Sequence, residues 1–533
     1  MPKQFQFKDD ARSQLMEGID LMARTVGITL GPNGRNVILE KEFGPPQVCS
    51  DGVTIAKEIE LPEPFLNMGA QLLKEAASKT NDDVGDGTTT STILAQAILK
   101  NGFKNIAAGA DPMALKRGID QVVDTITKEL IAMSKPVTDD DQISQVAILS
   151  AHDEKMGELI GQVMSKIGKD GVVTVEESRG LDYEVEYVEG MEIDRGYLSP
   201  YFVTDQDRMV TELNEPYIFI TSEKISNIED LVPFLEKFSA VGRELVIIAE
   251  DIEEQALATL VVNKMKGTLN CLGVKAPAFG DRRKAMLEDM SILFGGTVIS
   301  SETGRTLESV EISDLGRCRR VISTKDSTTF VEGGGQASLI EDRVSNIKAQ
   351  AQETKSDYDR EKLEERAARL SGGVSIIKVG AATEIELKEK KQRVEDALSA
   401  TRAAMEEGIL PGGGTSLIRI AEDLRDNFSD TSDESTGARI VLDSVGAPVE
   451  LLVRNAGFSG PVVLDAIKKG SDDYGFDAEN DRYGSMYDFG VIDPVKVTRS
   501  ALENAASISG MVLTTESLIT ELDPPKLPAP FDD

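Results

Sequence analysis

The sequence predicts a multidomain protein of mixed α and α/β class, with mostly helical blocks at both chain ends and an α/β region inserted between them. The 533 residues exceed the roughly 250 to 300 at which single cores stop growing. Apolar residues recur at helical spacing near both ends, and short apolar runs flank a helical pattern in the middle. Because chain termini often lie close together, both ends can build one helical domain.

The first block, up to about residue 133, is expected to be mostly helical. Residues 8–27 carry Asp9 and Asp10 near their start and apolar side chains at helical spacing. Residues 29–36 have the composition of a turn, and residues 37–39 are typical of a strand. Further helices are expected at 67–79, 91–101 and 112–133.

Near residue 135 the pattern changes and a region with strands begins. Alternating residues predict strands at 171–175 and 184–188. Two apolar runs, 245–249 and 271–274, flank a helix expected over 253–266, which together predict a βαβ unit. The remaining elements expected here are charged helices within 335–370 and a strand at 375–379.

After residue 384 the chain is expected to be helical again. Helices are predicted from 415 to about 469, interrupted by the polar stretch 427–436, and an Ala-rich helix is predicted over 495–510. The last residues, 523–533, are acidic and rich in proline, so we expect a loose tail.

Composition narrows the possible functions. The 92 acidic and 58 basic residues give a formal charge of −34, which argues against a general binder of nucleic acid or anionic membranes. No run approaches the ~18 apolar residues of a membrane span, and the first residues have neither a secretory nor a transit pattern. We therefore expect a cytoplasmic protein.

Cysteine and histidine are too sparse for the usual metal or nucleophile chemistry. Cys49, Cys271 and Cys318 lie far apart, so neither a disulfide framework nor a thiolate metal site is indicated. The single histidine, His152, lies in a polar stretch and is interpreted as a surface residue. Any chemistry must come from carboxylates, hydroxyls, backbone groups and bound ions.

The stretch 85–90, Gly-Asp-Gly-Thr-Thr-Thr, precedes an apolar helical run. Glycine on each side of Asp86 permits close backbone approach, and the threonines lie where free N–H groups of a helix start point outward. Such a start attracts phosphate, and one carboxylate beside it is enough to hold Mg²⁺ on a phosphate. On the residues alone, an ordinary turn with a threonine N-cap is the simpler interpretation.

Three glycine-rich turns and two acids are further candidates. The turns 31–34, 85–87 and 412–414 match neither the Walker nor the dinucleotide pattern. Asp51 precedes a glycine, and Asp396 falls about 200° from Val394 around its helix. By pattern alone, Asp396 is therefore a solvated charge on the face opposite the apolar stripe.

Two helices of the middle region, 230–238 and 253–266, carry more apolar residues than one buried stripe needs. Core packing from both sides is the commoner explanation. The alternative is an exposed apolar groove for nonpolar partners, since large exposed apolar patches mark interaction sites.

Several motifs occur in order along nearly the whole chain. They include Thr29-Leu-Gly-Pro, Gly34-Arg-Asn-Val, Gly85-Asp-Gly-Thr-Thr-Thr, Asp194-Arg-Gly-Tyr-Leu-Ser-Pro-Tyr-Phe, Arg393-Val-Glu-Asp-Ala and Asp493-Pro-Val-Lys-Val-Thr-Arg-Ser-Ala-Leu. Through them the sequence closely resembles the group I chaperonins, the GroEL type. Each motif is weak alone, but their joint order is highly specific.

The resemblance implies an ATP-hydrolysing chaperone that folds non-native polypeptides in a chamber closed by a small co-chaperonin lid. It also implies a homo-oligomer of two stacked seven-membered rings, without nucleic acid or membrane as a partner. The implied domains are a mostly helical equatorial domain, 1–133 and 408–533, a small α/β intermediate hinge domain, 134–189 and 374–407, and an inserted α/β apical domain, 190–373.

The resemblance further implies an ATP site with Mg²⁺ and K⁺. Asp396 matches the hydrolytic aspartate, and Asp51 matches a second carboxylate near the attacking water. Asp86 would hold Mg²⁺, while Thr29, Thr89 and the backbone carbonyl of Ser50 would hold K⁺. The nucleotide-binding residues implied are Thr29, Leu30, Gly31, Pro32, Asp86, Gly87, Thr88, Thr89 and Thr90 for the phosphates, and Gly413, Asp477, Ala478, Glu479 and Asp493 for base and ribose.

The resemblance also implies an apolar surface for non-native chains and for the lid. Burial of apolar segments on it would explain broad specificity, because hydrophobic contact is nondirectional. The residues implied are Tyr197, Tyr201, Phe202, Val232, Leu235, Leu257, Val261 and Val262.

Two departures from the family pattern keep alternatives open. Ser50 replaces a usual lysine before Asp51, and the acidic, Pro-rich end replaces a Gly-Gly-Met tail. A ring scaffold or holdase with a weakened ATP cycle is therefore the second hypothesis. A small-molecule phosphotransferase is the third, and it would need an acceptor pocket that no motif indicates.

Overall fold

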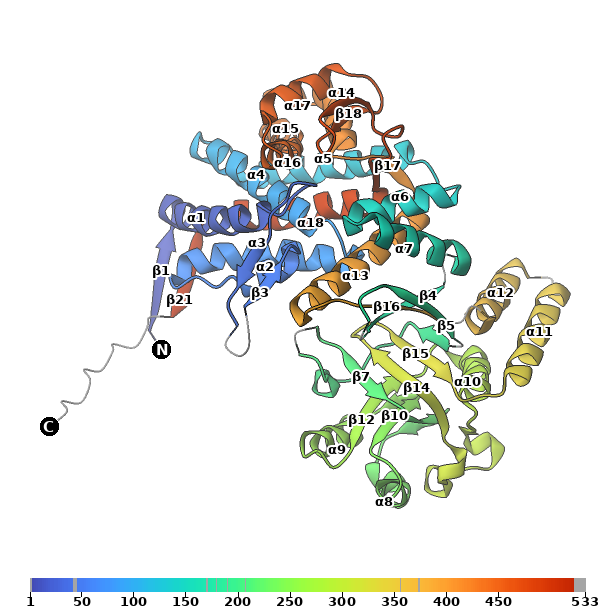
Figure 1. Cartoon of the computed structure of the whole chain (residues 1–533). Helices are drawn as coiled ribbons and strands as arrows, with labels where there is room; N and C mark the ends of the chain where they lie inside the picture. Colours follow the sequence, from blue (N-terminus) through green and yellow to red (C-terminus); the bar gives the residue numbers. More distant parts are fainter. Residues whose placement is uncertain are drawn as a thin grey trace. The chain divides into compact units, whose positions relative to one another are not determined.

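The computed structural model of the chain describes residues 2–41, 46–168, 171–178, 180–188, 190–206, 208–354, 356–371 and 374–521. It divides into two compact units (Figure 1). Unit 1 comprises residues 1–169, 177–183 and 379–533, and unit 2 comprises residues 170–176 and 184–378. The inserted arrangement agrees with the predicted multidomain α and α/β class. The finer division into three domains with a hinge remains a prediction.

Long helices form the core of unit 1, as predicted. Their apolar stripes are buried: in α1, Leu15, Ile19, Met22 and Val26 are all at most 1% exposed. The predicted helix 112–133 has the bounds of α5, whereas two predicted helices extend further at both ends. The packed helices are α1 (Lys8–Gly27), α3 (Pro64–Val84), α4 (Thr88–Ala107), α5 (Pro112–Met133) and α18 (Val495–Leu513).

Two helices of unit 1 lie where the sequence predicted a region with strands. They are α6 (Asp140–Ala151) and α7 (Glu154–Ile167). Each begins after an aspartate, Asp139 or Asp153, whose carboxylate accepts a backbone N–H of the first turn. This N-cap signal was present in the sequence, and the predicted strands begin only at Val172, after the two helices.

The remaining elements of unit 1 position the candidate site. Helix α13 (Glu384–Glu407) is followed by β17 (Ile409–Pro411), which pairs antiparallel with β20 (Ile492–Pro494). The later helices are α14 (Thr415–Leu424), α15 (Asp433–Ser444), α16 (Ala447–Asn455) and α17 (Gly460–Lys469). The short elements are α2 (Gly52–Glu58) and the ribbons β2 (Val37–Leu39) with β3 (Gln47–Cys49), β18 (Tyr474–Asp477) with β19 (Arg482–Ser485), and β1 (Lys3–Phe7) with β21 (Ser517–Glu521).

Unit 2 is built on a mixed sheet with the strand order β12-β10-β8-β14-β15-β6. Strand β10 runs parallel to β12, and α9 connects them, which confirms the predicted βαβ unit. A second sheet has the order β4-β16-β5. The main strands are β6 (Gly190–Ile193), β8 (Tyr217–Thr221), β10 (Glu244–Ala249), β12 (Asn270–Lys275), β14 (Gly316–Ser323) and β15 (Thr328–Gly333), with β4 (Val172–Glu177), β5 (Glu184–Val188) and β16 (Val374–Val379) in the second sheet.

The helices of unit 2 carry most of its functional candidates. Their buried side chains pack against the sheet; Phe234 and Phe238 are at most 1% exposed. The helices are α8 (Val232–Ser239), α9 (Glu254–Met265), α10 (Gly280–Phe294), α11 (Ala337–Glu353) and α12 (Asp357–Ser371).

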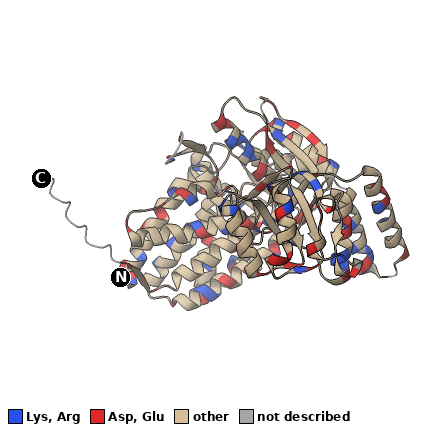
Figure 2. Cartoon of the chain, turned by 90° about the horizontal axis from the view of Figure 1, so that it is seen from below, with Lys and Arg blue, Asp and Glu red and all other residues tan. Residues whose placement is uncertain are grey.

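Charged side chains of both signs are interspersed over the helices and strands, as Figure 2 shows. None of the helices among the described residues is both long and apolar enough to cross a lipid bilayer. The predicted tail, 523–533, lies outside the described residues.

Candidate functional site

The stretch 85–90 forms the junction between α3 and α4. Gly85 (φ 69°) caps the end of α3 and Gly87 (φ 76°) is the N-cap of α4, so both glycines adopt the left-handed conformation that the motif predicted. The helix begins at Thr88, three residues before the predicted start. Thr88, Thr89 and Thr90 therefore form its first turn, whose N–H groups have no acceptor within the helix. Such a helix end favours anions.

Asp86 is fixed between the two glycines by hydrogen bonds to its carboxylate. The backbone N–H of Gly87 donates to Oδ1 over 2.5 Å, and the hydroxyl of Ser150 donates to Oδ2 over 3.2 Å. Burial raises the pKa of Asp86, which means that its negative charge is poorly solvated. A bound cation would offset that cost.

Asp51 lies beside the first turn of α4. Its carboxylate caps α2, accepting the N–H of Val53 over 3.3 Å and of Thr54 over 2.8 Å. The next residue, Gly52, lies so close that a Cβ there would be 2.4 Å from Oγ1 of Thr89. Glycine at this position thus permits the approach of α2 to α4.

The loop 29–32 follows α1 and is held by a residue far away in sequence. The side-chain amide of Asn455 donates to the carbonyl of Gly27 over 3.0 Å and to that of Leu30 over 2.9 Å. This fixes the hydroxyl of Thr29 at 3.3 Å from that of Thr89. The hydroxyl of Thr29, just after the end of α1, therefore lies next to the hydroxyl of Thr89 in the first turn of α4.

Asp396 of α13 does not point into solvent as its helical pattern suggested. It is partly buried, lines the same cavity as Asp51 and Asp86, and accepts a hydrogen bond from Nε2 of Gln392 over 3.0 Å. Burial, and then the negative charges of Asp51 and Asp86, raise its pKa well above the ordinary value. The pattern failed because the polar face of α13 borders a cavity rather than open solvent.

Arg393 lies one turn before Asp396 and also lines the cavity. Its Nε donates to Oε1 of Glu389 over 2.5 Å, which orients the guanidinium. Among the described lining residues it is the only lysine or arginine.

The β17–β20 ribbon brings the turn 412–414 next to Asp493. The carboxylate of Asp493 accepts the backbone N–H groups of Gly413 and Gly414. Burial, and then the charge of Asp86, raise the pKa of Asp493 to about 6. Four aspartates thus line one cavity.

The cavity has a volume of about 520 Å³, within the range of small-molecule sites. Its lining combines the free helix start and the aspartates with an apolar wall that includes Pro448, Val449 and Leu452. No cluster of three or more His, Cys, Asp or Glu side chains suited to a metal occurs within the described part of the chain. One carboxylate plus phosphate oxygens needs no such cluster, so the residues fit a nucleotide with Mg²⁺.

The cavity lining includes most of the residues that the sequence nominated for the nucleotide and ions. They are Thr29, Leu30, Gly31, Pro32, Ser50, Asp51, Asp86, Gly87, Thr88, Thr89, Thr90, Asp396, Gly413 and Asp493.

The segment 477–479, nominated for base and ribose, does not line the cavity in this structure. Asp477 is 4% exposed and caps its own turn, accepting the N–H of Glu479 over 3.1 Å and Nε of Arg482 over 2.8 Å. Ala478 is buried in an apolar cluster. Glu479 is exposed, and its charge acts on His152 at the cavity wall. The side chains of Asp477 and Ala478 therefore stabilise the local fold and do not face the cavity.

Sequence reasoning missed several contributors to the site. Ser150 and His152 end α6, a helix that the sequence analysis did not predict. His152 is exposed, as expected, yet it lines the cavity. Arg393 was part of a recognised motif, but nothing local indicated its direction. Asn455 acts through the backbone of a distant loop, and only tertiary contacts reveal it.

The apolar residues nominated in unit 2 divide into exposed and buried groups. Tyr201 is 66% exposed, Val262 46% and Val232 40%, and these three offer contact area to a partner. Leu235, Leu257 and Val261 are partly buried against the core. The nomination of two others needs correction, because Phe202 is fully buried and Tyr197 is 9% exposed. Both pack in the core of unit 2 and add little to an exposed surface.

Comparison with known proteins gives two findings. Residues 22–522 match the family model of the TCP-1/cpn60 chaperonin family. The fold is similar to the crystal structure of the chaperonin gp146 from the bacteriophage EL 2 (Pseudomonas aeruginosa), determined in the presence of ATP-BeFx. The identity is 22%, the TM-score is 0.70, and the match covers 97% of this chain and 99% of that chain.

Proposed function

Because this chain belongs to the TCP-1/cpn60 chaperonin family, we propose that it is an ATP-dependent folding chaperone of the group I, GroEL-like type. It binds non-native polypeptides and promotes their folding in a ring chamber closed by a small co-chaperonin. The chain assembles as two stacked seven-membered rings in the cytoplasm. The equatorial, intermediate and apical division, with the hinge at 134–189 and 374–407, belongs to the same proposal.

The observation that carries this proposal is the junction at 85–90. A free helix start and a partly buried aspartate face one cavity, together with two further aspartates from α2 and α13. The helix start suits the phosphates, and the aspartates suit a cation and a water molecule. An ordinary turn would not gather these three aspartates in one cavity.

The chain's own residues divide the hydrolysis between them. The N–H groups of Thr88, Thr89 and Thr90 bind the phosphate oxygens and stabilise the charge on the transferring phosphoryl group. Asp396 orients a water molecule and accepts its proton as the water oxygen bonds to the γ-phosphorus and the bond to the β-phosphate oxygen breaks. The products are ADP and phosphate. Asp51, fixed as a helix cap, holds the same water from a second side.

Burial raises the pKa values of Asp86 and Asp396, and a bound cation would lower them again. Magnesium, when held by Asp86, supplies positive charge to the phosphate oxygens and favours the ionised form of nearby aspartates. For potassium, the hydroxyls of Thr29 and Thr89 and the backbone carbonyl of Ser50 provide the oxygen ligands.

Unit 2 supplies the polypeptide-binding surface in this proposal. The exposed Tyr201, Val232 and Val262 bury apolar segments of non-native chains, with Leu235, Leu257 and Val261 extending the surface. Hydrophobic contact is nondirectional, so many different chains can bind.

A second candidate function is a ring scaffold or holdase with a weakened ATP cycle. The cavity lining favours this alternative in one respect. Ser50 supplies no positive charge, and Arg393 is the only lysine or arginine among the described residues that face the nucleotide cavity. Four aspartates with so little positive charge would weaken nucleotide binding.

The experiment that separates the two functions is steady-state phosphate release from Mg-ATP with potassium present. We expect slow turnover by the unmodified protein and a loss of at least about 100-fold in Asp396→Ala, because the general base is removed. Binding of a fluorescent ATP analogue should persist in the variant.

Asp82→Ala is the matched control, since Asp82 is an exposed aspartate on α3 outside the cavity. It should turn over ATP as the unmodified protein does. Nucleotide binding without hydrolysis by the unmodified ring would favour the scaffold, and turnover that survives in Asp396→Ala would exclude the assigned mechanism.

A further inference from the structure

The single histidine of the chain lies in the wall of the proposed nucleotide cavity, and the hydrolysis described above assigns it no role. His152 directly follows the last residue of α6 and lines the cavity together with Ser150 of that helix. It is also exposed to solvent. A residue that both lines a cavity and is exposed lies near the opening, where a ligand enters.

The backbone of His152 has the left-handed conformation, with a φ of 50° and a ψ of 31°. This conformation costs a non-glycine residue free energy. The neighbours on both sides fix it: Ala151 is fully buried, and the carboxylate of Asp153 accepts the N–H of Met156 in α7 over 2.9 Å. Glycine would adopt the same conformation without that cost, so the helix end itself does not require an imidazole.

Ser150 places His152 on the phosphate side of the cavity. The Ser150 hydroxyl donates to Oδ2 of Asp86 over 3.2 Å, and Asp86 directly precedes Gly87, the N-cap of α4. Two residues of backbone span at most ~7 Å, so the Cα of His152 lies within that distance of the Cα of Ser150. The imidazole is therefore on the side of the cavity that holds the free N–H groups of α4, which suit phosphate.

The charged neighbours of His152 agree with this position. Desolvation by the cavity wall lowers the pKa of the imidazole, and among charged side chains Asp86 acts on it most strongly, by raising the pKa. The other charged side chains that act on it are Arg393, Glu479 and Glu389. An imidazole keeps at least one N–H donor in either protonation state, whereas an ionised carboxylate has none. His152 thus adds a donor to a cavity that four aspartates line.

We propose that His152 is a nucleotide-binding residue, whose imidazole N–H donates a hydrogen bond to a phosphate oxygen of the bound nucleotide. This contact presupposes the proposed ATP site and adds to it a residue that the family resemblance did not nominate. Donors to phosphate offset the repulsion between the nucleotide and the surrounding carboxylates. His152 comes from the end of α6 and Arg393 from α13, so the phosphates would join these two helices to the start of α4.

Titration of the full-length protein with the fluorescent ADP analogue mant-ADP and Mg²⁺ tests this contact. His152→Gly and His152→Ala should each weaken mant-ADP binding about fivefold or more, because both lack the donor. The two variants differ in backbone, since glycine suits the positive φ and alanine keeps the strain. Thermal unfolding should therefore give His152→Gly the higher midpoint, while the loss of affinity should be the same in both.

Two competitors of mant-ADP identify the part of the nucleotide that His152 contacts. Tripolyphosphate carries phosphates without base or ribose, and adenosine carries base and ribose without phosphate. The affinity for tripolyphosphate should fall about fivefold or more in His152→Ala, because the donor to a phosphate oxygen is lost. The affinity for adenosine should be unchanged.

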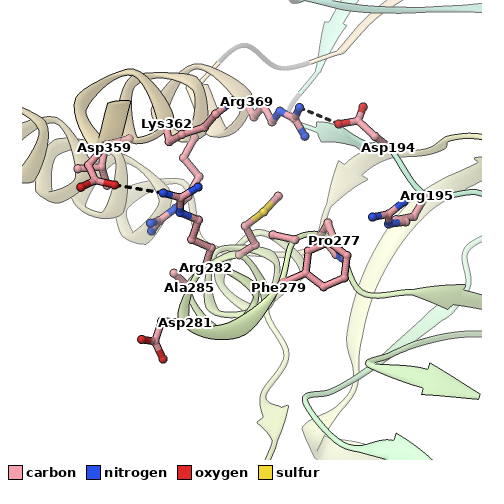
Figure 3. Close-up of a pocket in the computed structure, with 14 residues that line it drawn as sticks. Asp194, Arg195, Pro277, Phe279, Asp281, Arg282, Ala285, Asp359, Lys362 and Arg369 are labelled. Atoms are coloured by element: carbon pink, nitrogen blue, oxygen red, sulfur yellow. Dashed lines mark hydrogen bonds and ion pairs between the residues drawn. The ribbon is translucent and has the colours of Figure 1, made fainter. Parts of the chain in front are cut away.

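Two control variants should leave mant-ADP affinity unchanged. Asp472→Gly is the matched backbone control, since Asp472 has a φ of 46°, is exposed and lies outside the cavity. Phe279→Ser tests the rival position, a cavity of about 930 Å³ in unit 2. There the guanidinium of Arg195 lies 6.0 Å from the ring centre of the exposed Phe279 (Figure 3).

Different failures lead to different conclusions. Unchanged mant-ADP affinity in both His152 variants would exclude the contact and leave the ATP site in place. Weakening in His152→Ala alone would assign the effect to backbone strain, and equal weakening of adenosine and tripolyphosphate would exclude phosphate as the contacted group. Weakening in Phe279→Ser with affinity kept in the His152 variants would place the nucleotide in unit 2. No saturable mant-ADP binding by the unmodified protein would refute the proposed ATP site, and this contact with it.

Discussion

At the scale of single residues, the proposed nucleotide cavity is dominated by carboxylates whose charges are poorly solvated. The pKa values of Asp86, Asp396 and Asp493 are all raised, and burial is the first cause in each case. Their mutual repulsion adds to this effect, since each is influenced by at least one other aspartate of the cavity. In the absence of cations the site therefore destabilises the fold above the pKa values of these groups.

Asp493→Asn tests this destabilisation. Because the pKa of Asp493 is raised to about 6, the folded state binds its proton more tightly than the unfolded state, and stability falls as pH rises towards 6. We expect the variant to be more stable by roughly 1 to 3 kcal/mol at pH 7.5 and equal to the unmodified protein near pH 4. Thermal unfolding without Mg²⁺ or nucleotide measures this, with Asp82→Asn as control. A gain that is the same at every pH would contradict the electrostatic cause.

Arg393 is the second residue that calls for a test. Arg393 is the only lysine or arginine that the described lining contains. Its guanidinium is therefore the group best suited to pair with a phosphate. We expect Arg393→Ala to raise the KM for ATP about tenfold or more, with a smaller effect of Arg393→Lys. Lys388→Ala, on an exposed lysine of the same helix, is the control for α13. An unchanged KM in Arg393→Ala would mean that the guanidinium serves only its ion pair with Glu389.

At the scale of secondary-structure elements, the site depends on the close approach of α2 to the start of α4. Gly52 makes that approach possible, because a Cβ would lie 2.4 Å from Oγ1 of Thr89 and 2.8 Å from Oγ1 of Thr88. The same contact sets the position of Asp51 relative to the free N–H groups. Small backbone movements here should therefore affect nucleotide binding more than global stability.

Gly52→Ala is expected to lower ATP affinity at least about tenfold while the protein still folds, since the added methyl group displaces α2 from the first turn of α4. Isothermal titration with an ATP analogue measures the affinity, and circular dichroism measures the fold. Gly109→Ala is the control: its φ of 105° makes substitution strained, but no heavy atom lies within 4 Å of the added carbon. Equal losses in both variants would show a general strain effect instead of a specific contact.

At the scale of the whole molecule, the net charge of −34 means that copies of the chain repel each other unless apolar contacts offset the repulsion. The ribbon of β1 and β21 presents such contacts. Phe7 is 59% exposed, Phe5 54% and Ile519 53%, and the two phenyl rings stack 6.3 Å apart. A two-stranded ribbon is marginally stable alone and has open edges, so this one is a candidate contact between subunits.

Phe7→Ser should weaken ring assembly, because it removes apolar area from that contact. We expect a shift from large to small species in sedimentation velocity at a protein concentration where the unmodified chain is assembled, and high salt should partly restore assembly by screening the charges. Ile131→Ser, at a 52% exposed position of α5, is the control. If assembly is unchanged in Phe7→Ser but lost in the control, the subunit contact lies at α5 and not at the ribbon of β1 and β21.

The sequence by itself determined several of the elements and the conformation of the glycines in the stretch 85–90. The periodicity of residues 8–27 and 112–133 sufficed for α1 and α5, because one buried stripe leaves a clear 3.6-residue pattern. The βαβ unit followed from two apolar runs, since strands buried on both faces are continuously apolar. The glycines at positions 85 and 87 indicated a backbone with positive φ, which few other residues adopt.

Only the tertiary structure decided which polar faces are exposed to solvent. The helical pattern alone misplaced Asp396, because the polar face of its helix borders a cavity. The family resemblance nominated Phe202 for an exposed surface, but Phe202 is buried in the core. Ser150, Arg393 and Asn455 reach the site from elements distant in sequence. The physical reason is that the spacing of apolar residues shows only which face of a single helix or strand is buried. Solvation and charge at a site depend on every element that packs around it.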